Sequence, residues 1–198
     1  HGTTYSIQPD RIETATFLCA AAGCGGEVLL RRADARMLQS VTALLRQTGC
    51  ELLEEQDAVL VRKTGKTGII PDVKTAAYPG FPTDCQAILT AALLRAEGES
   101  RIEETVFEDR FHHVPELQKL GAKLEIHHNT VHISGIRTLS GAKLTARDLR
   151  GGAALVLAAM QAEGESRVEG LTHIDRGYER FAEKLRALGA NIERCFDA

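Results

Sequence analysis

The sequence has no long run of apolar residues and no excess of basic charge. No stretch approaches the roughly 18 consecutive apolar residues that a membrane-spanning helix needs, so we expect no membrane partner. The 24 lysines and arginines are outnumbered by 27 aspartates and glutamates, which gives a net charge of −3. This balance argues against nucleic acid as a partner. The first residues show no basic segment followed by an apolar one, so no secretory signal is expected.

Paired cysteines are also lacking. No two cysteines are spaced as Cys-x-x-Cys, and their number, five, is odd. A disulfide framework or a zinc site is therefore not expected, and a reducing cytoplasm fits best. Histidines occur at 112–113, 127–128 and 132, but no acid or cysteine completes a ligand spacing, so we expect neither a metal nor a cofactor. We interpret the cysteines as small buried hydrophobes: Cys19, Cys24, Cys50, Cys85 and Cys195.

What remains is an ordinary globular composition, with 43% hydrophobic and 26% charged residues among 198. Such a chain can bury a sizeable core, and no low-complexity linker divides it. We therefore expect a single domain over residues 1–198. The chain opens within a pattern and without methionine, so we also expect a fragment or a processed chain.

The sequence repeats itself. The hexapeptide Ala-Glu-Gly-Glu-Ser-Arg at 96–101 recurs unchanged at 162–167, an offset of 162 − 96 = 66 residues. The segment 120–125 reappears in related form at 188–193, and a fainter copy lies at 48–53. A fixed period of this kind indicates repeated supersecondary units. We predict three units, at about 3–70, 71–137 and 138–198.

Each unit is predicted to run β-α-β-α-β-β, which makes an α/β (α+β) fold of three repeats around a common core. The opening strands are expected at 4–8, 72–76 and 143–146. Helices rich in small residues, a composition that indicates burial on more than one face, follow at 10–23, 83–96 and 147–162. Further strands are expected at 27–31, 101–104 and 167–169, and amphipathic helices at 36–47, 110–120 and 176–188. Hairpins are expected at 51–54 with 59–62 and at 123–127 with 131–134.

The third unit is incomplete. It reaches a strand expected at 191–195 and lacks the last strand of the repeat. The missing strand comes from elsewhere in a longer protein, from a second copy, or is absent and leaves an exposed edge. Unpaired backbone groups along such an edge invite another strand, so self-association through it is one expectation.

Local signals mark the helix ends. Asp10 stands where an N-cap is expected, with Glu13 three residues later as in a capping box. Gly49, Gly121 and Gly189 stand where helix C-termini favour a left-handed residue.

Thr83 and Asp84 form the first chemically suggestive segment. They follow Tyr-Pro-Gly-Phe-Pro at 78–82, a stiff turn directly before a predicted helix. Such a loop can present a carboxylate to a ligand. The alternative is that both residues are helix N-caps with no further role.

Arginines mark two further segments. Arg110 lies beside Glu108 and Asp109 between a strand and a helix, and ordinary surface ion pairing is the alternative to a binding role. Arg150 and Arg176 are each expected in the first turn of a helix, where a cation opposes the helix dipole. This conflict favours a bound anion nearby, whereas the alternative is that both are solvated surface arginines.

Together these segments resemble the enolpyruvyl transferase family, and in particular its branch that acts on UDP-N-acetylglucosamine. The resemblance covers essentially the whole chain and rests on five segments in the family's order and spacing. These are 9–13, 81–84, 105–111, 148–150 and 173–179. The shikimate-pathway relative, enolpyruvylshikimate phosphate synthase, shares the repeat but resembles these segments less.

The resemblance implies a fold of two similar domains, each made of three repeats, with the active site between them. This chain resembles the C-terminal portion, whose remaining strand the family takes from the extreme N-terminus of the protein. It also implies transfer of enolpyruvate from phosphoenolpyruvate to the 3-hydroxyl of UDP-N-acetylglucosamine, in peptidoglycan synthesis for the growing and dividing cell wall. That reaction needs a base, an acid and cations for the carboxylate and phosphate.

On the nucleotide-sugar side, the resemblance makes Asp84 a sugar-binding residue and the general base. Thr83 and the backbone at Val106 and Phe107 correspond to sugar contacts. Arg110 corresponds to a nearby cationic contact.

On the phosphoenolpyruvate side, the resemblance makes Asp148 a carboxylate of the catalytic network. Arg150 and Arg176 correspond to arginines that bind phosphoenolpyruvate, and Arg176 belongs to the part that closes over the ligand and acts in catalysis. The family's acid-bearing loop cysteine and its uridine contacts lie on the other domain, so the chain alone is expected to be inactive. A non-catalytic binding module on the same repeat is the alternative.

Overall fold

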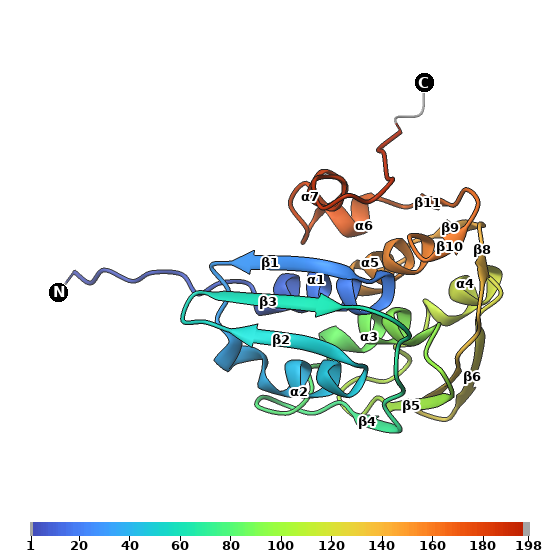
Figure 1. The fold of residues 1–198 in the computed structure, drawn as a ribbon, viewed down its shortest axis with the longest axis horizontal. Helices are drawn as coiled ribbons and strands as arrows, with labels where there is room; N and C mark the ends of the chain where they lie inside the picture. The colour runs from blue at the N-terminus through green and yellow to red at the C-terminus, as the bar shows by residue number, and fades with distance from the viewer. Residues whose placement is uncertain (1, 196–198) are drawn as a thin grey trace.

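Three helices rich in small residues form the centre of the molecule. The computed structural model describes residues 2–195. The central helices α1 (Arg11–Cys24), α3 (Gln86–Leu93) and α5 (Leu149–Ala159) pack against one another, with the sheets arranged around them (Figure 1). Every residue of α3 is buried, as is most of α1 and α5. The predicted burial of these helices on more than one face is therefore confirmed.

Two antiparallel-rich sheets lie outside these helices. The first sheet has the order β1–β3–β2, with the strands β1 (Gly26–Arg31), β3 (Ala58–Lys63) and β2 (Cys50–Glu54). The second has the order β4–β5–β7–β6, with β4 (Asp72–Lys74), β5 (Glu99–Glu103), β7 (Thr130–Ser134) and β6 (Lys123–His127). In both sheets the second strand of the predicted hairpin is an inner strand: β3 lies between β1 and β2, and β7 lies between β5 and β6. Strand β4 pairs in parallel with β5.

Two short parallel pairs complete the strands. They are β8 (Leu139–Ser140) with β10 (Ala162–Glu163), and β9 (Lys143–Thr145) with β11 (Arg167–Glu169). The β8–β10 pair was not predicted from the sequence, since neither segment alternates in hydrophobicity for more than two residues.

The remaining helices cover the outside of the molecule. They are η1 (Ala35–Leu38), α2 (Gln39–Gln47), η2 (Thr83–Cys85), α4 (Val114–Lys119), α6 (Thr172–Asp175) and α7 (Phe181–Ala187). Among residues 2–195, the helices are all too short or too polar to cross a membrane. The predicted helix ends are confirmed where they were marked by glycine, because Gly49, Gly121 and Gly189 all have positive φ angles.

Asp10 caps α1 as predicted. Its Oδ1 accepts hydrogen bonds from the backbone N–H groups of Ile12 (2.8 Å) and Glu13 (3.1 Å). The side chain of Glu13, however, accepts a hydrogen bond from Lys184 Nζ of α7 (2.7 Å) and does not complete a capping box. This contact ties the start of the first central helix to the last helix of the chain.

The strand expected at 4–8 is wrong. These residues have no regular structure, and the apolar side chains of Tyr5 and Ile7 are 75% and 92% exposed. In the second sheet the corresponding strand, β4, pairs with the outer edge of β5. Within residues 2–195, β1 is an edge strand and no strand pairs with its outer side. Residues 4–8 therefore make no hydrogen bonds to the sheet, and their apolar side chains are not buried.

The strand expected at 191–195 is also wrong, and the second sheet supplies the reason. There the outermost strand, β6, pairs with the inner strand β7 and not with β5. Within residues 2–195 no inner strand lies beside β11, so residues 191–195 have no ladder to join. The open edge therefore belongs to β11 and not to 191–195, which removes the stated basis for self-association.

The helices expected at 83–96 and 147–162 are shorter in the structure, and two others differ more from the prediction. The helix expected at 110–120 starts at Val114, and residues 110–113 belong to a loop. The helix expected at 176–188 is split into α6 and α7. At the break, the side chain of Tyr178 is buried in the core, where its hydroxyl lies 2.8 Å from Thr16 Oγ1. Arg180 adopts a left-handed conformation (φ 49°) directly before α7.

The cysteines are all free thiols, but they are not all buried. Cys19, Cys50 and Cys85 lie in the core as expected, whereas Cys24 and Cys195 are exposed. The interpretation of all five as buried hydrophobes is therefore wrong for these two.

The packing of the central helices makes a stability prediction. Leu89 of α3 is 1% exposed, whereas Leu53 of β2 is 62% exposed. We expect Leu89→Ala to lower the free energy of unfolding by about 2–5 kcal/mol, because the substitution leaves a cavity between tightly packed helices. Leu53→Ala is the matched control and should shift the urea midpoint little. Equal shifts for the two variants would show that the three-helix contact is not the main core.

Candidate active site

The site lies at the N-terminal ends of two central helices. Asp84 is in the single turn η2, directly before α3, and the preceding Pro82 fixes the extended entry. Arg150 is the second residue of α5, whose N-cap is Asp148; the Asp148 side chain accepts a hydrogen bond from Gly151 N at 2.7 Å. The N-terminal ends of α3 and α5 carry partial positive charge, which favours carboxylates and anionic ligands here.

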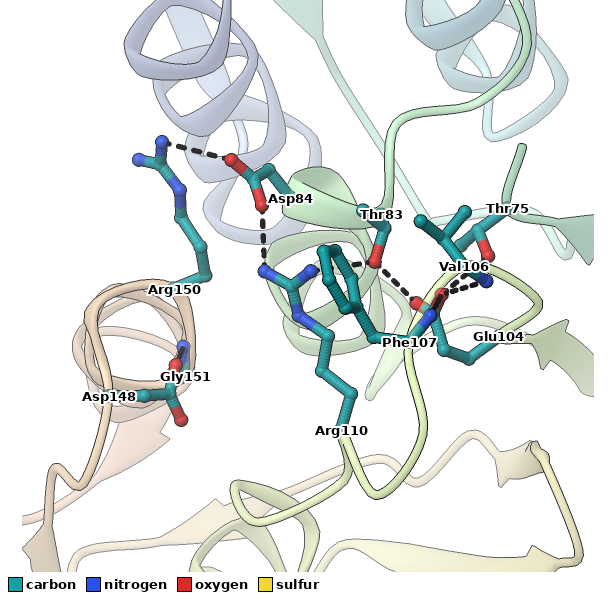
Figure 2. Close-up of polar contacts among 10 residues, drawn as sticks. All are labelled: Thr75, Thr83, Asp84, Glu104, Val106, Phe107, Arg110, Asp148, Arg150 and Gly151. Atoms are coloured by element: carbon teal, nitrogen blue, oxygen red, sulfur yellow. Dashed lines mark hydrogen bonds and ion pairs between the residues drawn. The ribbon is translucent and has the colours of Figure 1, made fainter. Parts of the chain in front are cut away.

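Asp84 lies between two arginines. Its Oδ1 is 2.7 Å from Arg110 Nη2, and its Oδ2 is 3.3 Å from Arg150 Nη2 (Figure 2). Partial burial alone would raise the pKa of Asp84, but the hydrogen bonds and charges of Arg110 and Arg150 outweigh it and lower the pKa below its ordinary value. The carboxylate is therefore ionised at neutral pH.

Arg150 is held from its other side by an aromatic ring. Its guanidinium carbon lies 5.3 Å from the ring centroid of Tyr178, and its side chain is 14% exposed. Two of its nitrogens, Nε and Nη1, are buried without a hydrogen-bond partner among residues 2–195. The hydroxyl of Tyr178 is hydrogen-bonded to Thr16 of α1, so α1 as well as α5 contributes to the position of this cation.

Arg110 does not make the surface ion pair that was its alternative interpretation. Its Nη2 binds Asp84, its Nη1 donates to Thr83 Oγ1 at 2.8 Å, and its guanidinium lies 4.9 Å from the ring centroid of Phe107. Thr83 in turn donates to Glu104 Oε2 at 2.7 Å. Figure 2 shows these residues converging from the start of α3 and from the loop that follows β5.

The structure brings most of the predicted site residues into one cavity of about 260 Å³. It is lined by Asp84, Arg110, His112, Asp148, Leu149, Arg150 and Arg176. The exposed residues Val106 and Phe107 lie instead in a neighbouring hollow of about 780 Å³, and Arg110 and His112 line both spaces. The smaller cavity, with three arginines in its lining, is a cationic pocket that lies beside a partly apolar hollow.

The expected position of Arg176 is corrected. It follows the end of α6 and does not lie in a first helical turn, so its charge does not oppose a helix dipole. The reasoning from dipole conflict holds for Arg150 alone. Arg176 reaches the pocket because the chain turns there to bury Tyr178, two residues later.

Sequence reasoning missed several residues of the site. His112 and Leu149 line the pocket, Glu104 supports Thr83, and Tyr178 supports Arg150. His112 and Glu104 lie within or directly beside the segment 105–111, which is the signal that could have found them. Tyr178 lies within the segment 173–179, but its contact with Arg150 joins α5 to the turn between α6 and α7, and the local sequence does not predict that contact.

Two buried groups near the site, Cys85 and His113, carry no charge at neutral pH. Burial raises the pKa of Cys85 to about 12, so this thiol stays protonated beside Asp84. Burial lowers the pKa of His113 to about 4, so its ring is neutral at physiological pH. In the part of the chain that the structure describes, no three His, Cys, Asp or Glu side chains gather as a metal site.

The chain is similar to known proteins over most of its length. Residues 1–185 match the family model described as EPSP synthase (3-phosphoshikimate 1-carboxyvinyltransferase). The UDP-N-acetylglucosamine 1-carboxyvinyltransferases of Salmonella dublin and Salmonella typhimurium are each 52% identical over 193 residues, which is 98% of this chain and 46% of theirs. The chain therefore spans about half the length of the curated relatives it matches.

Solved structures share the fold. The enolpyruvyl transferase NikO from Streptomyces tendae superposes with a TM-score of 0.83 at 29% identity, over 96% of this chain and 45% of that one. EPSP synthase from Acinetobacter baumannii gives a TM-score of 0.74 at 18% identity, over 93% of this chain and 46% of that one. The second likeness concerns the fold alone.

The arginine pair around Asp84 makes a titration prediction. We expect Arg110→Gln to raise the pKa of Asp84, because a hydrogen-bonded cation is removed while burial remains. The two ion pairs favour the folded protein above the ordinary carboxyl pKa, and this contribution is lost as the pH falls through the lowered pKa of Asp84. Carboxyl-carbon NMR titration measures the shift.

Arg95→Gln is the control for this titration, because Arg95 is exposed and donates to the carbonyl of Arg137. It should leave the titration of Asp84 unchanged. An unchanged pKa in Arg110→Gln would contradict the assigned ion pair.

Proposed function

The chain belongs to the EPSP synthase family of carboxyvinyltransferases, and from this premise we propose that it is the C-terminal portion of a UDP-N-acetylglucosamine 1-carboxyvinyltransferase. The observation that carries the proposal is the single pocket holding Asp84, Asp148, Arg110, Arg150 and Arg176. These residues are far apart in the sequence, and each stands in a segment that resembles the family. The 52% identity to nucleotide-sugar enzymes, against 18% to a solved EPSP synthase, favours UDP-N-acetylglucosamine over shikimate phosphate as the acceptor.

The proposed reaction is an addition followed by an elimination. The 3-hydroxyl oxygen of UDP-N-acetylglucosamine bonds to C2 of phosphoenolpyruvate, the hydroxyl proton leaves to a base, and a proton is added to C3. Loss of a C3 proton and of phosphate from the tetrahedral intermediate then yields the enolpyruvyl ether. The protein must therefore supply proton acceptors, a proton donor and cations for two anionic groups.

Asp84 is the proposed acceptor of the hydroxyl proton. Its two ion pairs keep it ionised before the substrate arrives, which is the state in which a base must start. The same pairs fix the direction of its two oxygens, one toward each arginine. Asp148, whose side chain accepts a hydrogen bond from the backbone N–H of Gly151 at the start of α5, is the second carboxylate of the pocket.

Arg150 and Arg176 are the proposed binding residues for phosphoenolpyruvate. Arg150 has two buried nitrogens that find no hydrogen-bond partner among the described residues, and the exposed Arg176 lines the same cavity. Guanidinium groups match the planar geometry of carboxylate and phosphate, and they stay charged at all physiological pH values. An exposed Arg176 on an irregular segment suits the role of a group that closes over the bound anion.

The proposal extends to the architecture. We interpret the chain as one domain of three β-α-β-α-β-β repeats, with the other catalytic domain outside it. The common order of the hairpin strands in the first two sheets supports this interpretation. The inner strand that β11 lacks among residues 2–195 is then supplied from outside these residues. The setting we propose is peptidoglycan synthesis in the cytoplasm, which five free thiols suit.

Replacement of Asp84 tests the catalytic role. In the full-length gene product we expect Asp84→Asn to lower turnover about 10²–10⁴-fold while the fold is kept, because the change is isosteric but removes the base. Phosphate release measures turnover. Asp72→Asn is the matched control, because Asp72 is an exposed aspartate of β4 paired with Arg101. Retention of more than about half the wild-type rate in Asp84→Asn would reduce Asp84 to a helix-terminal residue.

A further test of the proposed function concerns the 198-residue chain by itself. With both substrates present, its phosphate release should stay at background, since groups that act as a unit in the transition state are not separately dispensable. The full-length gene product at the same concentration is the positive control. Turnover by the chain alone would show that the proposed second domain supplies nothing essential.

A further inference from the structure

Glu104 is a buried carboxylate that the reaction scheme does not use. It lies directly after β5 and is 2% exposed, although ionised carboxylates are rarely buried without compensation. Four hydrogen bonds compensate it. Its Oε1 accepts from Thr75 Oγ1 (2.9 Å) and from the backbone N–H groups of Val106 (2.8 Å) and Phe107 (3.2 Å), and its Oε2 accepts from Thr83 Oγ1 (2.7 Å).

These bonds decide what the loop offers to a ligand. Because Glu104 takes the N–H groups of Val106 and Phe107, those donors are not free to bind a substrate. Within residues 2–195, neither carbonyl oxygen of the two residues accepts a hydrogen bond. Their side chains are 43% and 57% exposed in the larger hollow. The loop therefore presents carbonyl acceptors and apolar side chains, which suit a ligand rich in hydroxyl and amide donors.

The second oxygen of Glu104 acts on the cationic pocket. Thr83 Oγ1 donates to Glu104 and accepts from Arg110 Nη1, so Arg110 and the loop share one buried anchor. Arg110 in turn holds Asp84. Figure 2 shows the continuous path from Glu104 through Thr83 and Arg110 to Asp84.

We propose that Glu104 is a positioning residue for the nucleotide sugar: its carboxylate fixes the Val106–Phe107 backbone as an acceptor surface and sets Arg110 against Asp84. This inference rests on the proposed function. Glu104 touches no reacting atom and acts through the loop and through Thr83.

Two substitutions of different severity test the inference in the full-length gene product. Glu104→Ala removes all four acceptor contacts and should raise KM for UDP-N-acetylglucosamine about 10-fold or more, while KM for phosphoenolpyruvate changes less than about twofold. Glu104→Gln keeps an oxygen for the loop N–H groups and loses the acceptor for Thr83, so its KM should lie between wild type and Glu104→Ala. Glu125→Gln is the control, because Glu125 is 79% exposed on β6.

Amide hydrogen exchange gives a readout without substrate. The N–H groups of Val106 and Phe107 should be protected in wild type, exchange about 10-fold faster in Glu104→Ala, and stay nearer to wild type in Glu104→Gln. Exchange rates equal to wild type in Glu104→Ala overturn the inference. So does a fall in melting temperature with both KM values unchanged or raised equally, since that is the signature of a merely structural residue.

The two proposals fail in distinguishable ways. If wild type releases no phosphate with these substrates, the proposed function is wrong, and the role of Glu104 toward a nucleotide sugar falls with it. The exchange data then still establish or refute the anchoring of the loop. If wild type is active and Glu104→Ala keeps the wild-type KM for UDP-N-acetylglucosamine, the inference alone is wrong.

Discussion

The packing of α1, α3 and α5 against one another is the constraint on which the rest of the molecule depends. These helices are buried on nearly every side, and their small residues allow the backbones to approach closely. At Gly23 of α1, a Cβ atom would lie 3.2 Å from the Cα atom of Ala92 in α3. Helices packed this closely hold their ends in fixed relative positions, so Asp84 before α3 and Arg150 at the start of α5 are held within contact of each other.

Asp84 and the anionic ligand that we propose share one guanidinium group, that of Arg150. The pKa of Asp84 is low because Arg110 and Arg150 pair with it. In the proposed reaction, an anion bound to Arg150 would weaken that pairing, so the pKa of Asp84 would rise and its carboxylate would become a better proton acceptor. By linkage, anion and proton bind with positive cooperativity, and anion affinity increases as the pH falls toward the pKa of Asp84.

Local patterns predicted the central helices, the hairpins and the Asp10 cap, because each is encoded in a short segment that repeats or carries a capping residue. The strand expected at 191–195 failed because a strand needs a partner that those residues do not encode. Glu104 was missed for a similar reason. A glutamate at a strand end indicates a surface position, and its burial follows from Thr75 and Thr83, which approach from other elements.

Asp84 and Arg150 are separated by 66 residues, which is also the offset of the repeated hexapeptide. They therefore occupy equivalent positions in successive copies of the sequence, and they touch each other. A duplicated unit that kept one residue type at this position would set like charges 3–4 Å apart, at a cost that rises as the surroundings become drier. The repeat in the sequence thus carries a requirement for asymmetry: where equivalent positions meet, as Asp84 and Arg150 do, residues of unlike charge are needed, and their pairing creates a polar site.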